Sequence, residues 1–194
     1  MQVAVIGGTG DIGEGLVLRW GLHTNHELIV GSRDPEKARA CAERYREELT
    51  ARDVNPEIRG TSNPDAAADA DVVVLSVPPE YITDTIEVIS DSLSTDTTIA
   101  SPAVSMMRDS DGFHYKPPEA ADSVTELAAH ALPHDVDVVG AFHNLSADRL
   151  ANLDAKLNID TVVFGSDEDA VTTVTTLAED IDGHRFAGQT IGAK

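Results

Sequence analysis

Short runs of β-branched and other apolar residues alternate with segments of helical periodicity along the 194-residue chain. The runs predict strands near residues 3–6, 26–30, 57–60, 71–77, 97–101, 136–142, 161–164 and 184–187. Apolar residues three and four positions apart predict a helix that starts near residue 11 and others over 35–52, 82–93, 124–132 and 171–181. This alternation is typical of a doubly wound, mostly parallel α/β sheet with helices on both faces.

A glycine-rich segment, Gly7-Gly8-Thr9-Gly10-Asp11-Ile12-Gly13, joins the first predicted strand to the first predicted helix. Within it, Gly8, Gly10 and Gly13 form the pattern GxGxxG. At such a position glycines allow a tight turn and a close approach to a pyrophosphate, and the helix offers free N–H groups. The segment therefore predicts a dinucleotide site on a Rossmann-type fold, with a plain glycine turn as the alternative.

The end of the second predicted strand discriminates between NADP and NAD. An NAD enzyme usually has an acidic residue about 20 positions beyond the glycines, where it binds the ribose. Here the sequence is Gly31-Ser32-Arg33-Asp34. Ser32 and Arg33 suit a 2′-phosphate, and Lys37 adds a second positive charge one helical turn later. We expect NADP, with Asp34 as an alternative ribose ligand.

The expected organisation is a Rossmann domain over residues 1–145 and a small C-terminal α/β extension over 146–194. A single domain over 1–194 is the alternative. Residues 102–118 are polar and contain Asp109-Ser110-Asp111-Gly112, which predicts a long loop. Long loops of this kind are often functional, and a purely structural insertion is the other interpretation.

The net charge of −20 excludes some classes of partner. It repels nucleic-acid phosphates and anionic lipid, so we expect neither as a partner. Acidic residues are spread along the chain and lysines are few, which is typical of a halophilic protein from a high-salt cytoplasm. An ordinary acidic protein is the alternative.

Other functions are excluded by what the sequence lacks. Cys41 is the single cysteine, so neither a disulfide within the chain nor a cysteine zinc site is expected, and no histidine spacing predicts a metal. There is no apolar run of about 18 residues and no signal-peptide pattern at the start. We therefore expect a cytoplasmic protein without a membrane segment.

Several segments carry a resemblance to a known family. In chain order they are residues 3–13, Val30-Gly31-Ser32-Arg33, Val74-Leu75-Ser76-Val77-Pro78, Ser101-Pro102 with Gly112-Phe113-His114-Tyr115, Ala141-Phe142-His143-Asn144-Leu145, and Arg149-Leu150-Ala151-Asn152-Leu153. Together they resemble the archaeal NADP-dependent reductases of the deazaflavin coenzyme F420. The first two are shared with many Rossmann enzymes, and the last are more specific to this family.

The resemblance implies which residues contact the cofactors. It implies that the glycine segment and the positions suited to a 2′-phosphate hold NADP, that the segment after the fourth strand passes the nicotinamide, and that His143 and Leu145 position the two stacked rings. The residues expected at NADP or coenzyme F420 are Gly8, Thr9, Gly10, Asp11, Ile12, Gly13, Ser32, Arg33, Lys37, Val77, Pro78, Pro79, Met106, His143 and Ala147. A homodimer is also implied, although residues 1–194 do not include the apolar helix that the family uses for dimer contacts.

The implied reaction is reversible hydride transfer between reduced coenzyme F420 and NADP. Such a transfer requires stacked rings and exclusion of water rather than a protein acid or base, so no dedicated catalytic residue is expected. The tyrosines lack a Tyr-x-x-x-Lys spacing, which argues against a short-chain dehydrogenase. The alternatives are another NADP-dependent Rossmann reductase acting on a small imine or keto acid, and a non-catalytic NADP-sensing module.

Overall fold

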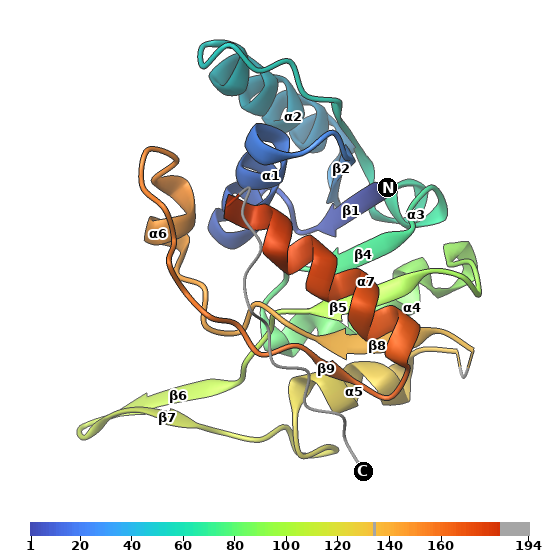
Figure 1. The fold of residues 1–194 in the computed structure, drawn as a ribbon. Helices are drawn as coiled ribbons and strands as arrows, with labels where there is room; N and C mark the ends of the chain where they lie inside the picture. Colours follow the sequence, from blue (N-terminus) through green and yellow to red (C-terminus); the bar gives the residue numbers. More distant parts are fainter. Residues whose placement is uncertain (134, 183–194) are drawn as a thin grey trace.

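A computed structural model describes residues 1–133 and 135–182 of the protein (Figure 1). The strands are β1 (Gln2–Ile6), β2 (Glu27–Ser32), β3 (Ile58–Ser62), β4 (Val72–Leu75), β5 (Thr98–Ser101), β6 (Met106–Asp109), β7 (Gly112–Tyr115), β8 (Asp137–Gly140) and β9 (Phe164–Gly165). The helices are α1 (Asp11–His23), α2 (Pro35–Thr50), α3 (Asn63–Ala68), α4 (Ile82–Ile89), α5 (Val124–Ala131), α6 (Ala147–Ala151) and α7 (Glu168–Glu179). Short 3₁₀ turns are η1 (Pro79–Tyr81), η2 (Ser90–Ser92) and η3 (Asp180–Asp182).

Seven strands form one sheet in the order β3-β2-β1-β4-β5-β8-β9. Neighbouring strands are parallel except for β9, which runs antiparallel to β8. The chain builds outward from β1 to β3 and then returns to add β4 on the other side of β1. In open sheets, ligands bind beyond the carboxyl ends of the strands at such a reversal. The topology therefore predicts a ligand site at the carboxyl ends of β1 and β4.

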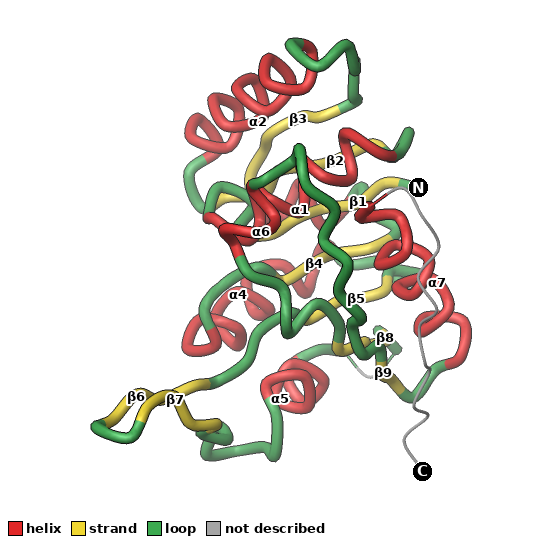
Figure 2. The backbone as a smooth tube through the Cα atoms, turned by 60° about the vertical axis from the view of Figure 1, so that its left-hand side comes forward, coloured by secondary structure: helices red, strands yellow, loops and turns green. Residues whose placement is uncertain are grey.

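Two apolar cores lie on the two faces of this sheet, because successive side chains of a strand point to opposite sides. Val3 and Val5 of β1 belong to the core under α1, α2 and α7, whereas Ala4 and Ile6 belong to the core under α3, α4 and α5. Figures 1 and 2 show these helices on the two faces of the sheet. The doubly wound α/β fold expected from the hydrophobic pattern is thus confirmed.

Two expectations about the second half of the chain are wrong. Residues 102–118 are not a continuous loop, because β6 and β7 pair as an antiparallel hairpin within them. The strand expected over 161–164 starts only at Phe164 and is antiparallel. The final strand expected near 184–187 lies outside the described residues. Among the helices that the structure describes, none is long and apolar enough to cross a membrane.

A buried arginine of α1 holds the segment that follows residue 145. Arg19 is 1% exposed and its guanidinium lies 2.6 Å from the carboxylate of Asp182. It also donates hydrogen bonds of 2.7–3.0 Å to the backbone carbonyls of Arg149, Leu150, Asn152 and Ala155. The second Asp182 oxygen accepts from the Leu157 N–H at 2.7 Å. Residues 146–182 are thereby fastened to the first helix, and whether they form a separate domain stays a prediction.

We expect Arg19→Met to lower the free energy of unfolding by about 3–5 kcal/mol, because the substitution leaves the buried Asp182 carboxylate without its charge partner. Urea unfolding followed by the fluorescence of Trp20, the single tryptophan, measures this change. Arg46→Met is the matched control, since it removes only an exposed pair with Glu43 and should cost less than about 1 kcal/mol. Equal losses in the two variants would contradict the buried role of Arg19.

Candidate functional site

The glycine loop after β1 lies directly against the end of β4. Gly7 has a φ of 80°, in the left-handed region that favours glycine. A Cβ atom on Gly7 would lie 2.3 Å from the carbonyl oxygen of Ser76 and 2.9 Å from a methyl group of Val77. Only a glycine fits there. The loop and the start of the segment from Val77 to Pro79 are therefore brought together at the sheet reversal.

The same loop packs closely on the first turn of α1. A Cβ atom on Gly13 would lie 2.7 Å from both the Gly7 carbonyl oxygen and the Gly8 Cα. Gly10 occupies the N-cap of α1 and offers no side chain to the free N–H groups of the first turn. Gly10 is exposed, and Thr9 and Ile12 are half-buried beside it. The helix thus begins with its backbone close to solvent.

A tyrosine that sequence analysis did not single out supports the loop from α2. Tyr45 is fully buried and its hydroxyl donates to the Gly8 carbonyl oxygen at 2.9 Å. Burial raises the pKa of this phenol, so the hydroxyl stays protonated and able to donate. Glu14 of α1 lies beside it and forms a two-pronged pair with Arg44, at 2.6 and 2.9 Å. The hydrogen bond from Tyr45 therefore fixes the glycine loop to α2.

The residues after β2 form a polar corner at the same edge. The Asp34 carboxylate accepts from the N–H groups of Glu36 and Lys37, at 3.0 and 3.2 Å, and so caps α2. The Ser32 hydroxyl accepts from the Asp34 N–H at 3.2 Å. Asp34 thus has a structural task as an N-cap residue, which weakens the alternative in which it binds a ribose.

Two cations at this corner have no acidic partner within the described part of the chain. Arg33 and Lys37 are exposed, and neither forms an ion pair with a described residue. Arg39, which lies on α2 with Lys37, pairs instead with Glu36. The Arg33 guanidinium instead lies 5.9 Å from the ring centre of Tyr81, in the turn after Pro79. This contact joins the ends of β2 and β4. In a chain of net charge −20, uncompensated cations favour an anionic ligand.

His143 lies just beyond β8, next to Phe142 in the chain and against the ring of Phe164. Phe142 has a φ of 65° and its buried ring meets Trp20 edge-on at 5.8 Å. The half-buried imidazole of His143 stacks on Phe164, with ring centres 5.5 Å apart and planes at 15°. A Cβ atom on Gly140 would lie 2.2 Å from the Phe164 ring, so glycine is needed for this stack. Burial lowers the pKa of His143, which keeps the ring neutral at pH 7.

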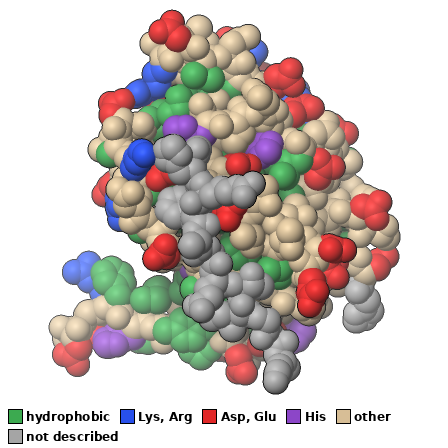
Figure 3. All heavy atoms as spheres, in the orientation of Figure 1, with side chains coloured by type: hydrophobic (Ala, Val, Ile, Leu, Met, Phe, Trp, Pro, Cys, Tyr) green, Lys and Arg blue, Asp and Glu red, His purple; other side chains and the backbone are tan. Residues whose placement is uncertain are grey.

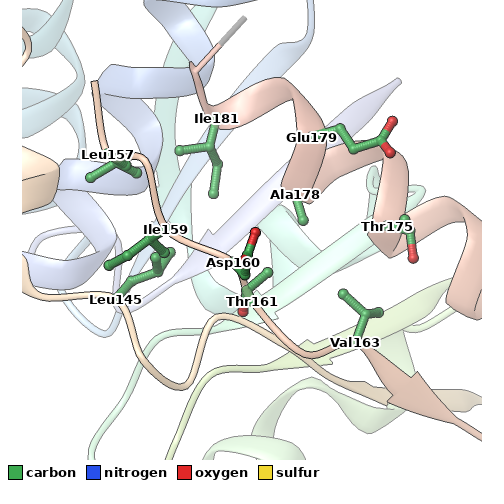
Figure 4. A pocket seen from close by; sticks show the side chains of 10 residues that line it. All are labelled: Leu145, Leu157, Ile159, Asp160, Thr161, Val163, Thr175, Ala178, Glu179 and Ile181. Atoms are coloured by element: carbon green, nitrogen blue, oxygen red, sulfur yellow. The ribbon is translucent and has the colours of Figure 1, made fainter. Parts of the chain in front are cut away.

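The remaining predicted site residues are spread along the edge. Leu145 is half-buried and faces a pocket that the 157–163 segment and α7 also line (Figure 4). This pocket is mainly apolar, and Leu157 and Ile159 stand opposite the α7 side chains within it. Ala147 begins α6, and Met106 is 50% exposed at the base of the β6–β7 hairpin.

Among the described residues no group of histidine, cysteine and acidic side chains is arranged to hold a metal ion. The site consists instead of three parts. They are a glycine loop at the start of α1, a polar corner whose Arg33 and Lys37 have no acidic partner among the described residues, and a half-buried, neutral histidine just beyond β8. Residues 2–105 match the family model described as NADP oxidoreductase, coenzyme F420-dependent. The chain belongs to this family.

Relatives of known name support the assignment over almost the full chain. The protein is 38% identical over 187 residues to the F420-dependent NADP reductase of Methanocaldococcus jannaschii, an alignment that covers 95% of this chain and 82% of the relative. It is 36% identical over 186 residues to the enzyme of the same name from Methanothermobacter thermautotrophicus, with 95% and 79% covered. Both sources are archaeal, and the resemblance found in the sequence is confirmed.

Solved structures support the fold. A putative F420-dependent NADP reductase from an Arthrobacter species superposes with a TM-score of 0.74 at 21% identity, covering 99% of this chain and 84% of the other. A pyrroline-5-carboxylate reductase from Coxiella burnetii gives 0.62 at 19% identity, covering 100% and 58%. At these identities the likeness concerns the Rossmann-type fold alone.

Proposed function

We propose that this protein is an F420-dependent NADP oxidoreductase that transfers a hydride reversibly between reduced coenzyme F420 and NADP. The observation that carries the proposal is the match to reductases of this name over 95% of the chain, together with an intact glycine loop packed on the end of β4. The expectation of an imine or keto acid reductase is not favoured, since structures of that kind resemble this chain only in fold.

The residues at the carboxyl ends of β1 and β2 fit NADP in one orientation, with its pyrophosphate at the start of α1 and its 2′-phosphate after β2. The pyrophosphate would lie over the exposed backbone of Gly10 and the first turn of α1. The 2′-phosphate would lie at the corner formed by Ser32, Arg33 and Lys37, where two cations have no acidic partner among the described residues and the Asp34 carboxylate already caps α2. The planar Arg33 guanidinium, which lies 5.9 Å from the centre of the Tyr81 ring, can donate two hydrogen bonds to such a phosphate.

The nicotinamide would then lie at the end of β4, beside Val77 and the two prolines that follow. Deazaflavin and nicotinamide each carry the reacting carbon, so a hydride, with its two electrons, passes directly from one ring to the other. The N–H proton of the reduced deazaflavin leaves to solvent, which balances the reaction. The protein positions the rings about 3–3.5 Å apart and excludes water. His143, neutral and fixed by Phe164, has the role of a positioning residue beside the rings.

We further propose that the enzyme works in the cytoplasm, as a homodimer, on small molecules rather than nucleic acid. The net charge of −20 supports the exclusion of nucleic acid, because phosphates would be repelled. In this proposal residues 1–145 hold NADP, and the extension from residue 146 packs on α1 through Leu150 and the hydrogen bonds of Arg19.

Arg33→Ala should weaken NADP binding by about 1.5–3 kcal/mol, the usual range for hydrogen bonds to charged groups, and leave NAD binding nearly unchanged. Calorimetric titration of the purified protein with each dinucleotide measures the difference. Arg39→Ala, on the adjoining helix α2, is the control, since that arginine already pairs with Glu36. Equal losses of NADP and NAD affinity in the first variant would rule out the 2′-phosphate assignment.

Direct transfer should carry deuterium from the reacting carbon of labelled, reduced coenzyme F420 to one face of the nicotinamide. Mass spectrometry and proton NMR of the NADPH detect the label. The control reaction uses unlabelled reduced coenzyme in D₂O and should place no deuterium at that carbon. Label from solvent would contradict hydride transfer, and NADP binding without any turnover would favour the sensing module instead.

A further inference from the structure

One N–H group of the glycine loop differs from its neighbours in having no acceptor. The N–H groups of Gly7, Gly8 and Gly10 donate to backbone carbonyls at 3.0–3.1 Å. The Thr9 N–H has no acceptor among the residues that the structure describes. Backbone N–H groups need a partner, which is protein, water or a ligand. The Thr9 N–H is therefore available to a ligand bound at this loop.

The orientation of this N–H follows from the carbonyl of the same peptide. In a trans peptide the C=O and the N–H that follows it point in opposite directions. The peptide between Gly8 and Thr9 is trans, and its carbonyl oxygen accepts from the Tyr45 hydroxyl of α2 at 2.9 Å. The Thr9 N–H therefore points away from α2, and the hydrogen bond from Tyr45 fixes this direction.

The Tyr45 hydroxyl has one hydrogen and two acceptors within reach. The Gly8 carbonyl oxygen lies at 2.9 Å and Oε2 of Glu14 at 3.3 Å. A carboxylate is the stronger acceptor, but Arg44 donates to both oxygens of Glu14, at 2.6 and 2.9 Å. The Arg44 guanidinium also lies 4.9 Å from the centre of the Tyr45 ring. Arg44 thus occupies the competing acceptor and leaves the hydroxyl to the Gly8 carbonyl.

The pair of Arg44 with Glu14 also changes the charge near the loop. Glu14 lies in the first turn of α1, at the helix end where we place the pyrophosphate. An uncompensated carboxylate there would repel a phosphate. Figure 3 shows Asp and Glu side chains spread over the visible face and fewer Lys and Arg side chains, so counter-charges are scarce. Arg44 supplies one at this position.

We propose that Tyr45 is a positioning residue for dinucleotide binding, which directs the Thr9 N–H toward the pyrophosphate through the Gly8 carbonyl. This inference rests on the proposed function and deepens it, because it assigns part of pyrophosphate recognition to a side chain that is fully buried and does not reach the cofactor. The Thr9 N–H adds one donor to the free N–H groups in the first turn of α1.

Tyr45→Phe tests the inference, because it removes the hydroxyl and keeps the buried ring. The dissociation constants of NADP, NAD and ADP should each rise about tenfold, the scale of one hydrogen bond to a charged group, since all three carry a pyrophosphate. The dissociation constant of 2′-AMP, which has a 2′-phosphate and no pyrophosphate, should stay unchanged. Arg33→Ala should give the opposite pattern, with weaker 2′-AMP binding and unchanged ADP binding. Calorimetric titration of the full chain measures all four ligands.

Two further variants on α2 separate positioning from stability. Arg44→Gln keeps Tyr45 but frees Glu14 to compete for the hydroxyl, so it should also raise the ADP dissociation constant and leave that of 2′-AMP unchanged. Arg46→Gln is the matched control, since it removes only an exposed pair with Glu43 and should change neither constant. Urea unfolding checks that each variant is folded, and Arg44→Gln decides the question if Tyr45→Phe is not.

The outcomes separate this inference from the proposed function. The titrations need no second substrate, so NADP binding without hydride transfer in the unmodified protein would overturn the function alone. No NADP binding by the unmodified protein would overturn both. Unchanged ADP binding in Tyr45→Phe, or equal losses of ADP and 2′-AMP binding, would overturn the inference and leave the hydroxyl a purely structural role.

Discussion

The close approach of the glycine loop to the end of β4 is the constraint on which the site depends. Gly7 leaves no space for a side chain between itself and the Ser76 carbonyl, and Gly13 leaves none between α1 and the loop. These contacts set where the first helix starts and where Val77 emerges from the sheet. Tyr45 then holds the loop from α2. A dinucleotide bound along this edge would meet backbone groups whose positions are set before it arrives.

The helix that begins at this loop also organises the far end of the described chain. Arg19 on α1 binds four carbonyl oxygens of the segment after residue 148 and the carboxylate of Asp182. Trp20, its neighbour, donates to the Leu177 carbonyl at 2.9 Å. One helix thus connects the proposed pyrophosphate site with the segment that follows His143. This arrangement accounts for a buried charge in a helix whose other buried residues are all apolar or glycine.

Much of the fold and part of the site are visible in the sequence. The alternating pattern predicts the sheet, and the spacing of Gly8, Gly10 and Gly13 predicts the loop, because both signals are local. Arg19 and Tyr45 could not be found in this way, since each acts through partners more than 30 residues away. The hairpin was missed because half of its residues are polar or glycine and its turn, Ser110-Asp111, was interpreted as part of a loop. The halophilic interpretation stays a prediction from composition.

Gly10→Ala tests most directly the claim that the glycine loop receives the dinucleotide. Gly10 has a φ of −98°, which alanine adopts readily, and an added Cβ would have one neighbour, the Gly7 carbonyl oxygen at 3.4 Å. The free protein should therefore keep its stability to within about 0.5 kcal/mol. NADP binding measured by calorimetry should fall about 100-fold, because the methyl group lies where the pyrophosphate approaches. Unchanged NADP affinity in a stable variant would contradict the account.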